Sequence, residues 1–137
     1  MSIHSSIKIY ASPNAVWSIW ENVDQWNVWD PDVQWSQLDG EFCQGTTGTL
    51  KPKRGPVTPF IISHCVPFES FTPQSSLPLC HLIFKHSITH DVHFVTVTHS
   101  VEFSGISSFI FSRLIGRAIQ KGMPTVLTQL KKYSEAL

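Results

Sequence analysis

The C-terminal third of the chain carries an apolar pattern that restricts the possible folds more than any other feature. After Gly105 the spacing of apolar residues changes from two to steps of three and four. The recurring positions are Phe111, Ile115, Ile119, Met123, Val126, Leu130, Tyr133 and Leu137. This spacing predicts one long amphipathic helix that starts near Ile106 and packs its apolar stripe against a sheet.

Pro124 lies within this predicted helix. A proline in a helix interior has no N–H to donate and clashes with the preceding turn, so it frees the carbonyl of Gln120. The sequence therefore predicts a kink between Gln120 and Pro124, with Gly122 allowing the helix to pass close to the rim of the sheet.

The residues before Gly105 alternate between apolar and polar, which is typical of strands. The clearest case is 94–104, where Val95, Val97, His99, Val101 and Phe103 share one face. Ser12 and Pro13 open a short helix at 13–20, and a second is predicted at 22–29. The predicted strands are 3–10, 32–39, 46–54, 57–66, 68–75, 79–89 and 94–104.

The dimensions of these elements predict a curved sheet. A helix of about 31 residues is roughly 46 Å long but only about 10–12 Å wide. Seven strands at about 4.8 Å spacing are roughly 33 Å across. One helix cannot cover a flat sheet of that width. The expected fold is α+β: a curved antiparallel seven-stranded sheet wrapped around a long C-terminal helix, with two short helices after the first strand. Such a curl tends to leave interior space for a ligand.

Composition and charge exclude several classes of function. Ten basic and ten acidic residues balance, so the broad attraction needed for nucleic-acid binding is missing. No apolar run is long enough for stable membrane insertion. Three cysteines without CxxC spacing are typical of reduced thiols, and no signal peptide is evident, so we expect a cytoplasmic protein. Catalytic serine elbows and phosphate loops are also absent.

Several motifs together resemble one superfamily. They are Ala11-Ser-Pro-Asn-Ala-Val-Trp17, Trp26-Asn-Val-Trp-Asp-Pro31, Leu38-Asp-Gly40, Gly45-Thr-Thr-Gly48, Thr98-His-Ser-Val101 and the ending Leu130-Lys-Lys-Tyr-Ser-Glu135. The chain resembles the START-like, Bet v 1-like (SRPBCC) superfamily, in particular its polyketide cyclase/dehydrase and lipid-transport branch. The resemblance implies a helix-grip fold, with residues 1–137 forming a single START-like ligand-binding domain. Arg54 falls in the third strand, where some cyclases of this superfamily carry an arginine in the cavity.

The histidines are the main polar candidates for the interior. His86 shares a strand face with Phe84, and His99 shares one with Phe103. If the turn between their strands is Asp91–Phe94, the two histidines face each other directly. His64 lies on the predicted face of Phe60 and Ile62 and is expected to join them. Three interpretations stay open: hydrogen-bonded core residues, a polar anchor or acid/base for a ligand, and a zinc site whose further ligands are not evident.

The predicted ligand chamber combines these histidines with apolar residues. Its lining is expected to be His86, His99, His64, Phe84, Phe103, Ile119 and Met123, with Trp29 and Trp35 near its mouth. We expect no metal and no cofactor, and no residue is assigned as catalytic.

Three functions are compatible with this sequence. The first is binding or transport of a hydrophobic small molecule such as a lipid, polyketide, aromatic or quinone-like compound. The second is a cyclase or dehydratase that acts on a polyketide-like substrate, with His86 and His99 as acid and base. The third is a protein-interaction module that uses its tryptophan-rich end. Either a monomer or a homodimer is compatible with the sequence. Whether the chain is an enzyme also stays open.

Overall fold

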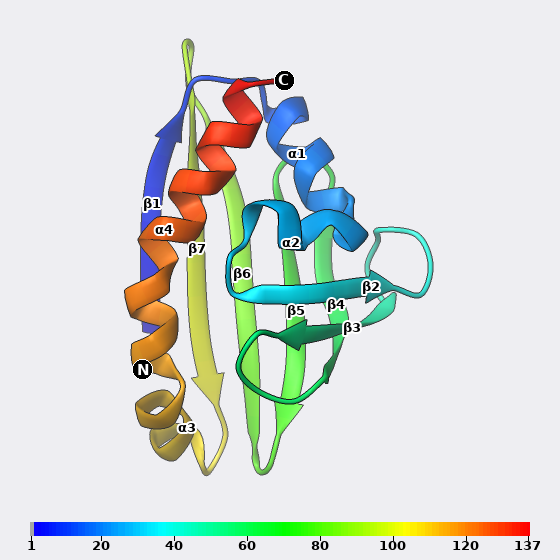
Figure 1. Ribbon diagram of the computed structural model, residues 1–137, viewed down its shortest axis with the longest axis vertical. Helices are drawn as coiled ribbons and strands as arrows, with labels where there is room; N and C mark the ends of the chain where they lie inside the picture. The colour runs from blue at the N-terminus through cyan, green and yellow to red at the C-terminus, as the bar shows by residue number, and fades with distance from the viewer. Residues whose placement is uncertain (1) are drawn as a thin grey trace.

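The computed structural model describes residues 2–137. Its elements, in chain order, are β1 (Ser2–Ile9), α1 (Pro13–Glu21), the 3-10 turn η1 (Val23–Gln25), α2 (Trp26–Trp29), β2 (Val33–Leu38), β3 (Thr47–Pro52), β4 (Thr58–Val66), β5 (Ser70–Leu77), β6 (Cys80–His90), β7 (Val95–Ser104), α3 (Ser108–Leu114) and α4 (Gly116–Glu135). The strands form one antiparallel sheet in the order β1-β7-β6-β5-β4-β3-β2. The predicted α+β, helix-grip architecture is therefore confirmed (Figure 1).

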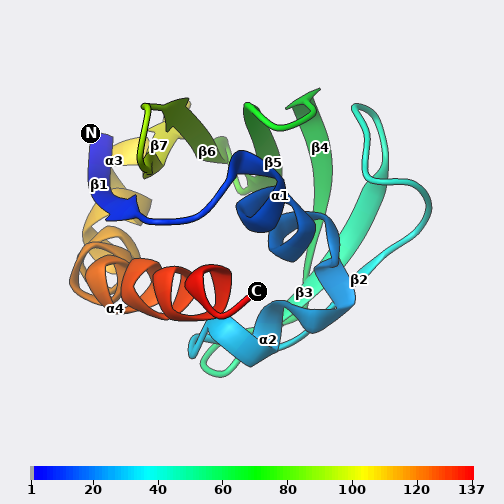
Figure 2. The ribbon, with the colours of Figure 1, turned by 90° about the horizontal axis from the view of Figure 1, so that it is seen from above.

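The sheet curves around α4, as the widths of sheet and helix require. Figure 2 shows α4 on the concave, open side of the arc of strands, with α1 and α2 on the same side. Strand β7 alternates strictly between buried and half-buried residues, so one face of the sheet is core and the other faces water. The first predicted short helix is present, and Ser12 caps it through a hydrogen bond from the Ala15 amide (3.2 Å).

The C-terminal helix differs from the prediction in where it is interrupted. It is divided into α3 and α4 at Ile115, which has φ −111° and ψ −33°. Gly116 follows, and a Cβ there would lie 3.2 Å from the side chain of Ile3. Glycine is a poor helix former, and this one lets the chain approach β1 closely at the break. Helix α4 then continues through Pro124, so the interruption at Ile115 lies nine residues before the proline and outside the predicted span from Gln120 to Pro124.

The apolar stripe of the helix is buried over most of its length. Met123, Val126, Leu127 and Leu130 are buried, and Leu130 is fully inaccessible to solvent. Phe111, Ile115 and Ile119 are half-buried against the sheet. Leu137 is exposed, so the stripe ends before the last residue. The stripe residues near the α3 end are thus covered less completely than those near the C-terminus.

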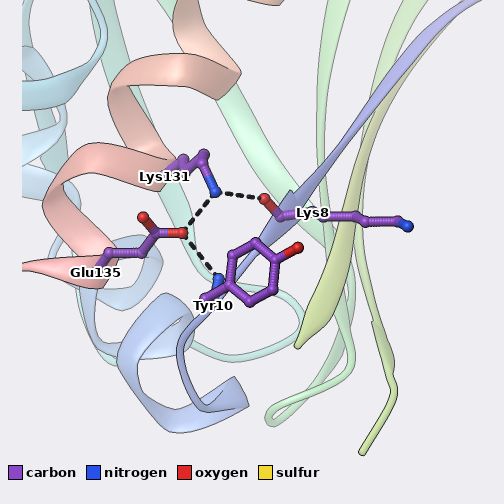
Figure 3. A network of polar contacts seen from close by, with 4 residues as sticks. All are labelled: Lys8, Tyr10, Lys131 and Glu135. Atoms are coloured by element: carbon purple, nitrogen blue, oxygen red, sulfur yellow. Dashed lines mark hydrogen bonds and ion pairs between the residues drawn. The ribbon is translucent and has the colours of Figure 1, made fainter. Parts of the chain in front are cut away.

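Polar contacts tie the last turns of α4 to the end of β1 (Figure 3). The Lys131 ammonium donates to the Lys8 carbonyl (2.9 Å) and pairs with Glu135 (2.6 Å). Glu135 also accepts a hydrogen bond from the Tyr10 amide (2.8 Å), and Lys131 lies over the Tyr10 ring. The hydrogen bond from Lys131 and that from the Tyr10 amide lower the pKa of Glu135. We call these four residues the α4 clamp.

Pro73 lies inside β5, as it does in the predicted strand 68–75. A proline is compatible with a strand only where no ladder donor is required. The pairing of β5 with β6 is interrupted at Thr72 and Pro73, between the pairs Phe71–His86 and Gln74–Ile83. The strand therefore continues to Leu77, and the turn between β5 and β6 falls at Pro78 and Leu79.

Candidate functional site

The β6–β7 hairpin brings two histidines together in the interior. The Asp91 amide donates to the Phe94 carbonyl (2.9 Å) across the turn, which sets the register of the hairpin. In that register His86 pairs directly with His99, as the sequence predicted. Both side chains point to the concave face and are buried, and their ring centroids are 4.5 Å apart.

Aromatic rings surround this pair. The His86 ring is stacked with Phe71 (4.1 Å between centroids) and with Phe84 (4.8 Å). Trp20 of α1 lies over both histidines, at 5.6 Å from His86 and 6.0 Å from His99. Trp29 of α2 is 6.5 Å from His99. The two imidazoles are therefore set into an aromatic chamber between the sheet and the helices, and side chains fill that chamber.

The two histidines differ in their hydrogen bonds. His86 donates from Nδ1 to the Phe84 carbonyl (3.1 Å). Both ring nitrogens of His99 are buried without a partner, as are the indole nitrogens of Trp20 and Trp29. Trp26 differs, since its indole donates to the Trp20 carbonyl (2.9 Å). Each unpaired buried polar group costs about 1–3 kcal/mol, and proteins contain few of them. Four such atoms on three neighbouring rings mark the polar part of the site.

Burial keeps both imidazoles neutral. Desolvation lowers the pKa of His99 to about 3. Desolvation, together with the neighbouring His99, lowers the pKa of His86 well below its ordinary value. A neutral imidazole offers one donor and one acceptor, so His99 can bind a hydroxyl or a carbonyl group of a ligand.

Most of the predicted apolar lining gathers in one place. Phe103 and Met123 are buried in a second core cluster, and Phe84 and Ile119 are half-buried against it. Phe84 connects this cluster to the histidines because its ring is 5.9 Å from that of His99. Trp29 is buried in the first cluster, which contains the other rings around the histidines, and so it lies inside the core instead of at a mouth.

Two predicted site residues, His64 and Trp35, lie outside the chamber. The register of β4 shifts between Ile62 and His64, and that of β2 shifts between Val33 and Trp35. A β-bulge adds one residue to a strand and so reverses which side chains face inward beyond it. Cys65 and Ser36 consequently take the inward positions. His64 is exposed and lies within hydrogen-bond distance of Ser70 (3.2 Å), and Trp35 is 39% exposed.

Phe71 and Trp20 are two residues of the site that the sequence did not single out. Phe71 pairs in register with His86 across β5 and β6. Extending the pairing from the hairpin to the next strand would have found it. Trp20 is the last buried aromatic residue on the inner face of α1, where the helix points toward the concave side of the sheet.

Asp30 is a second perturbed group that the sequence did not single out. It follows α2, is half-buried, and accepts a hydrogen bond from the Asp32 amide (2.9 Å). Desolvation raises its pKa to about 6, and the nearby Asp32 carboxylate adds to this rise, whereas the hydrogen bond and Lys53 oppose it. Asp32 also lies against α4, because a Cβ at Gly122 would be 2.9 Å from its Oδ2.

A hollow of about 470 Å³ is found on the outer face of the sheet and not in the predicted chamber. It is open to solvent. Most of its lining residues are of polar type, but the surface that they present to it is mainly apolar: Ser63, His64, Ser70, Thr72, Ile83, Lys85, His86, Ser87 and Ser100. Within residues 2–137, no group of three or more His, Cys, Asp or Glu side chains is arranged to hold a metal ion. No helix in the same range is long and apolar enough to cross a bilayer.

Comparison with solved structures assigns this architecture to a known fold. One similar structure is the di-domain aromatase/cyclase StfQ of steffimycin biosynthesis (TM-score 0.79, 10% identity, 98% of this chain and 50% of that one). A second is truncated norcoclaurine synthase from Thalictrum flavum (TM-score 0.72, 12% identity, 96% and 91%). A third is Ara h 8.0201 (TM-score 0.74, 10% identity, 100% and 99%).

These similarities define the class of protein by its fold. The chain has the Bet v 1-like, helix-grip fold, as its resemblance to the START-like superfamily implied. By sequence, no family profile matches the chain and no curated protein is similar to it. Function must therefore be argued from the residues of the site.

Proposed function

We propose that this protein binds a small hydrophobic molecule that carries one polar head group, with His99 as the anchor for that group. The observation that carries the proposal is the set of buried, unpartnered nitrogens on His99, Trp20 and Trp29. A ligand hydroxyl or carbonyl at this point would satisfy groups that are otherwise costly to bury.

The apolar part of the ligand has a matching surface next to this head-group site. Phe84, Phe103, Ile119 and Met123 continue from the His99 ring toward α3. The half-buried members of this cluster mark the less completely covered side of the core. The ligand would enter there and lie between β6, β7 and the first turns of α4.

Catalysis by the histidine pair is less well supported than binding. A general acid or base works best when its pKa lies near the operating pH. The pKa of His99 is about 3 and that of His86 is also well below its ordinary value, so neither ring is protonated to the imidazolium that a general acid requires. Arg54, the candidate cavity arginine, is exposed beyond the end of β3. These observations favour a carrier over a cyclase or dehydratase.

The tryptophans also argue against an interaction module built on them. Trp17, Trp20, Trp26 and Trp29 are buried, and only Trp35 is substantially exposed. A docking surface requires a contiguous exposed patch, and a single tryptophan does not supply one.

A matched pair of probes tests the role of His99. 1-Naphthol and naphthalene have the same ring system and differ by one hydroxyl group. We expect 1-naphthol to bind the protein more tightly, by the equivalent of one hydrogen bond or about 2- to 12-fold. His99→Phe should keep the fold and remove this preference, measured by quenching of tryptophan fluorescence. His64→Phe on the outer face is the control and should retain the preference.

Two results would refute the proposal. The first is equal affinity of the wild-type protein for both probes. The second is an unchanged preference in His99→Phe, which would make the histidine an ordinary core residue. Native mass spectrometry of the freshly purified protein gives an independent measurement, because a copurified ligand would appear as a fixed added mass that His99→Phe reduces.

A further inference from the structure

Five large apolar side chains are exposed together at one end of the molecule. They lie in the β5–β6 turn, the β7–α3 loop and α3: Leu79, Ile106, Phe109, Ile110 and Leu114. Figure 1 shows these three segments at the same end, opposite the C-terminus. Single exposed apolar residues are ordinary, but a contiguous group of this size marks an interaction surface. We call these five residues the apolar tip.

Backbone contacts hold the parts of the apolar tip together. The Ser107 amide donates to the Leu79 carbonyl (3.2 Å), and the Ser107 hydroxyl donates to the carbonyl of Pro78. Gly105 has φ +124°, and a Cβ there would collide with the Leu79 carbonyl oxygen, so only glycine permits this close approach. These contacts fix the three segments of the apolar tip relative to one another.

Helix α3 is apolar on its solvent side as well as on its core side. Ser112 is buried and Phe111 is half-buried toward the second core cluster. Phe109, Ile110 and Leu114 point away from that cluster and are exposed, Leu114 to 72%. Several large apolar side chains exposed on one side of a helix are typical of a surface that contacts a partner. The outward side of α3 is therefore expected to be covered by a partner.

The charges beside the tip are all of one sign. Arg113 and Arg117 are exposed on α3 and the first turn of α4, and no Asp or Glu occurs between residues 103 and 134. Of the acidic residues contributed by neighbouring elements, Glu102 pairs with Lys85 on the outer face of the sheet (3.4 Å). Asp32 lies beside Gly122, more than one turn along α4 from the break. The partner of the tip should therefore be negatively charged.

We propose that the apolar tip docks on the surface of an anionic lipid bilayer. Protruding apolar side chains beside exposed basic groups suit the interface of a bilayer, where the chains enter the headgroup region and the cations face lipid phosphates. A second copy of this chain fits poorly, because two tips would bring like charges together. The proposal does not depend on the ligand site, although it places the tip beside the route proposed for the ligand.

Co-sedimentation with lipid vesicles tests this docking. Wild-type protein should sediment with vesicles of phosphatidylcholine and phosphatidylserine, but not with phosphatidylcholine alone, and salt should weaken the binding. Leu114→Ser and the double variant Arg113→Gln/Arg117→Gln should each lower the vesicle partition coefficient about tenfold or more. Val92→Ser is the matched control, because Val92 is equally exposed but lies in the β6–β7 turn, at the other end of the hairpin.

Three outcomes would overturn the proposal. Wild-type protein could stay in the supernatant with the anionic vesicles, or Val92→Ser could lose as much binding as Leu114→Ser. Alternatively, sedimentation equilibrium could show a dimer that Leu114→Ser dissociates, which would make the tip a contact between copies of the chain. Circular dichroism of each variant confirms that it is folded, which these exposed positions should permit. Because His99→Phe leaves the tip intact, it should bind vesicles like the wild type even if the ligand proposal fails.

Discussion

At the scale of single residues, Asp30 illustrates how burial of one carboxyl group affects stability. Its pKa is about 6 in the folded protein and near 3.8 in the unfolded chain. The folded state therefore holds this proton more tightly, and stability falls as the pH rises from about 4 to about 6. At neutral pH the protein retains a desolvated negative charge that the Asp32 carboxylate makes less favourable.

Asp30→Asn should remove this destabilisation. The amide oxygen can still accept the hydrogen bond from the Asp32 backbone, so the turn is preserved. We expect the variant to be about 1–2 kcal/mol more stable than wild type at pH 7 and equal to it near pH 4, measured by urea unfolding. Asp24→Asn, at an exposed position, is the control. A gain of the same size at both pH values would contradict the assignment.

At the scale of elements, α4 is the part of the fold on which packing depends most directly. Leu130 is fully buried at the centre of the first core cluster. Leu130→Ala should lower the free energy of unfolding by about 2–5 kcal/mol, because it removes apolar contacts and leaves a cavity. Urea denaturation measures the change. Lys132→Ala, an exposed neighbour on the same helix, should change stability by less than about 0.5 kcal/mol; a comparable loss in both variants would contradict the helix-grip packing.

The order of the helices and strands could be predicted from the sequence because it depends on the spacing of the apolar residues. The alternation in 94–104 and the stripe from Phe111 to Leu130 each record which face is buried. The pairing of His86 with His99 followed from one turn and the two-residue repeat. Where the apolar residues follow a regular repeat, the sequence is therefore enough to predict which side chains are buried.

Most departures from the predicted structure occur where tertiary packing breaks the regular repeat of apolar residues. The bulges in β2 and β4 turned Trp35 and His64 outward, and no residue type in either strand signals an inserted position. The break at Ile115 depends on close approach to Ile3, more than a hundred residues away in the chain. Pro124 was a clear local signal, but its exposed position lets water satisfy the carbonyl of Gln120, and the helix continues.

At the scale of the whole molecule, the buried histidine pair sets the response to acid. The pKa of each histidine is lowered in the folded state, so the unfolded chain binds more protons below about pH 6.5. Stability is therefore fully present above that pH and is lost as the pH falls toward 3. The contribution of Asp30 has the opposite slope between pH 4 and 6, and two histidines outweigh one carboxyl group there.

His99→Phe should reduce this acid sensitivity. Between pH 7 and 4.5 the wild type should lose about 2–3 kcal/mol more stability than the variant, because the variant has one fewer buried group to protonate. Urea unfolding at the two pH values gives the difference directly. His64→Phe, at an exposed position, should behave like the wild type. Parallel curves for His99→Phe and the wild type would mean that other groups drive acid unfolding.

The α4 clamp has a mechanical consequence for the molecule. Lys131 and Glu135 attach one end of α4 to β1, while the other end meets the backbone break at Ile115. Helix α4 is thus held by polar contacts at its C-terminal end and is separated from α3 by a backbone break at its N-terminal end. Its 20 residues span about 30 Å, so a tilt of only about 10° about the α4 clamp would displace the α3 end by roughly 5 Å. Such a tilt would move Ile119, which packs in the cluster of Phe103, much farther than Leu130, which lies close to the α4 clamp.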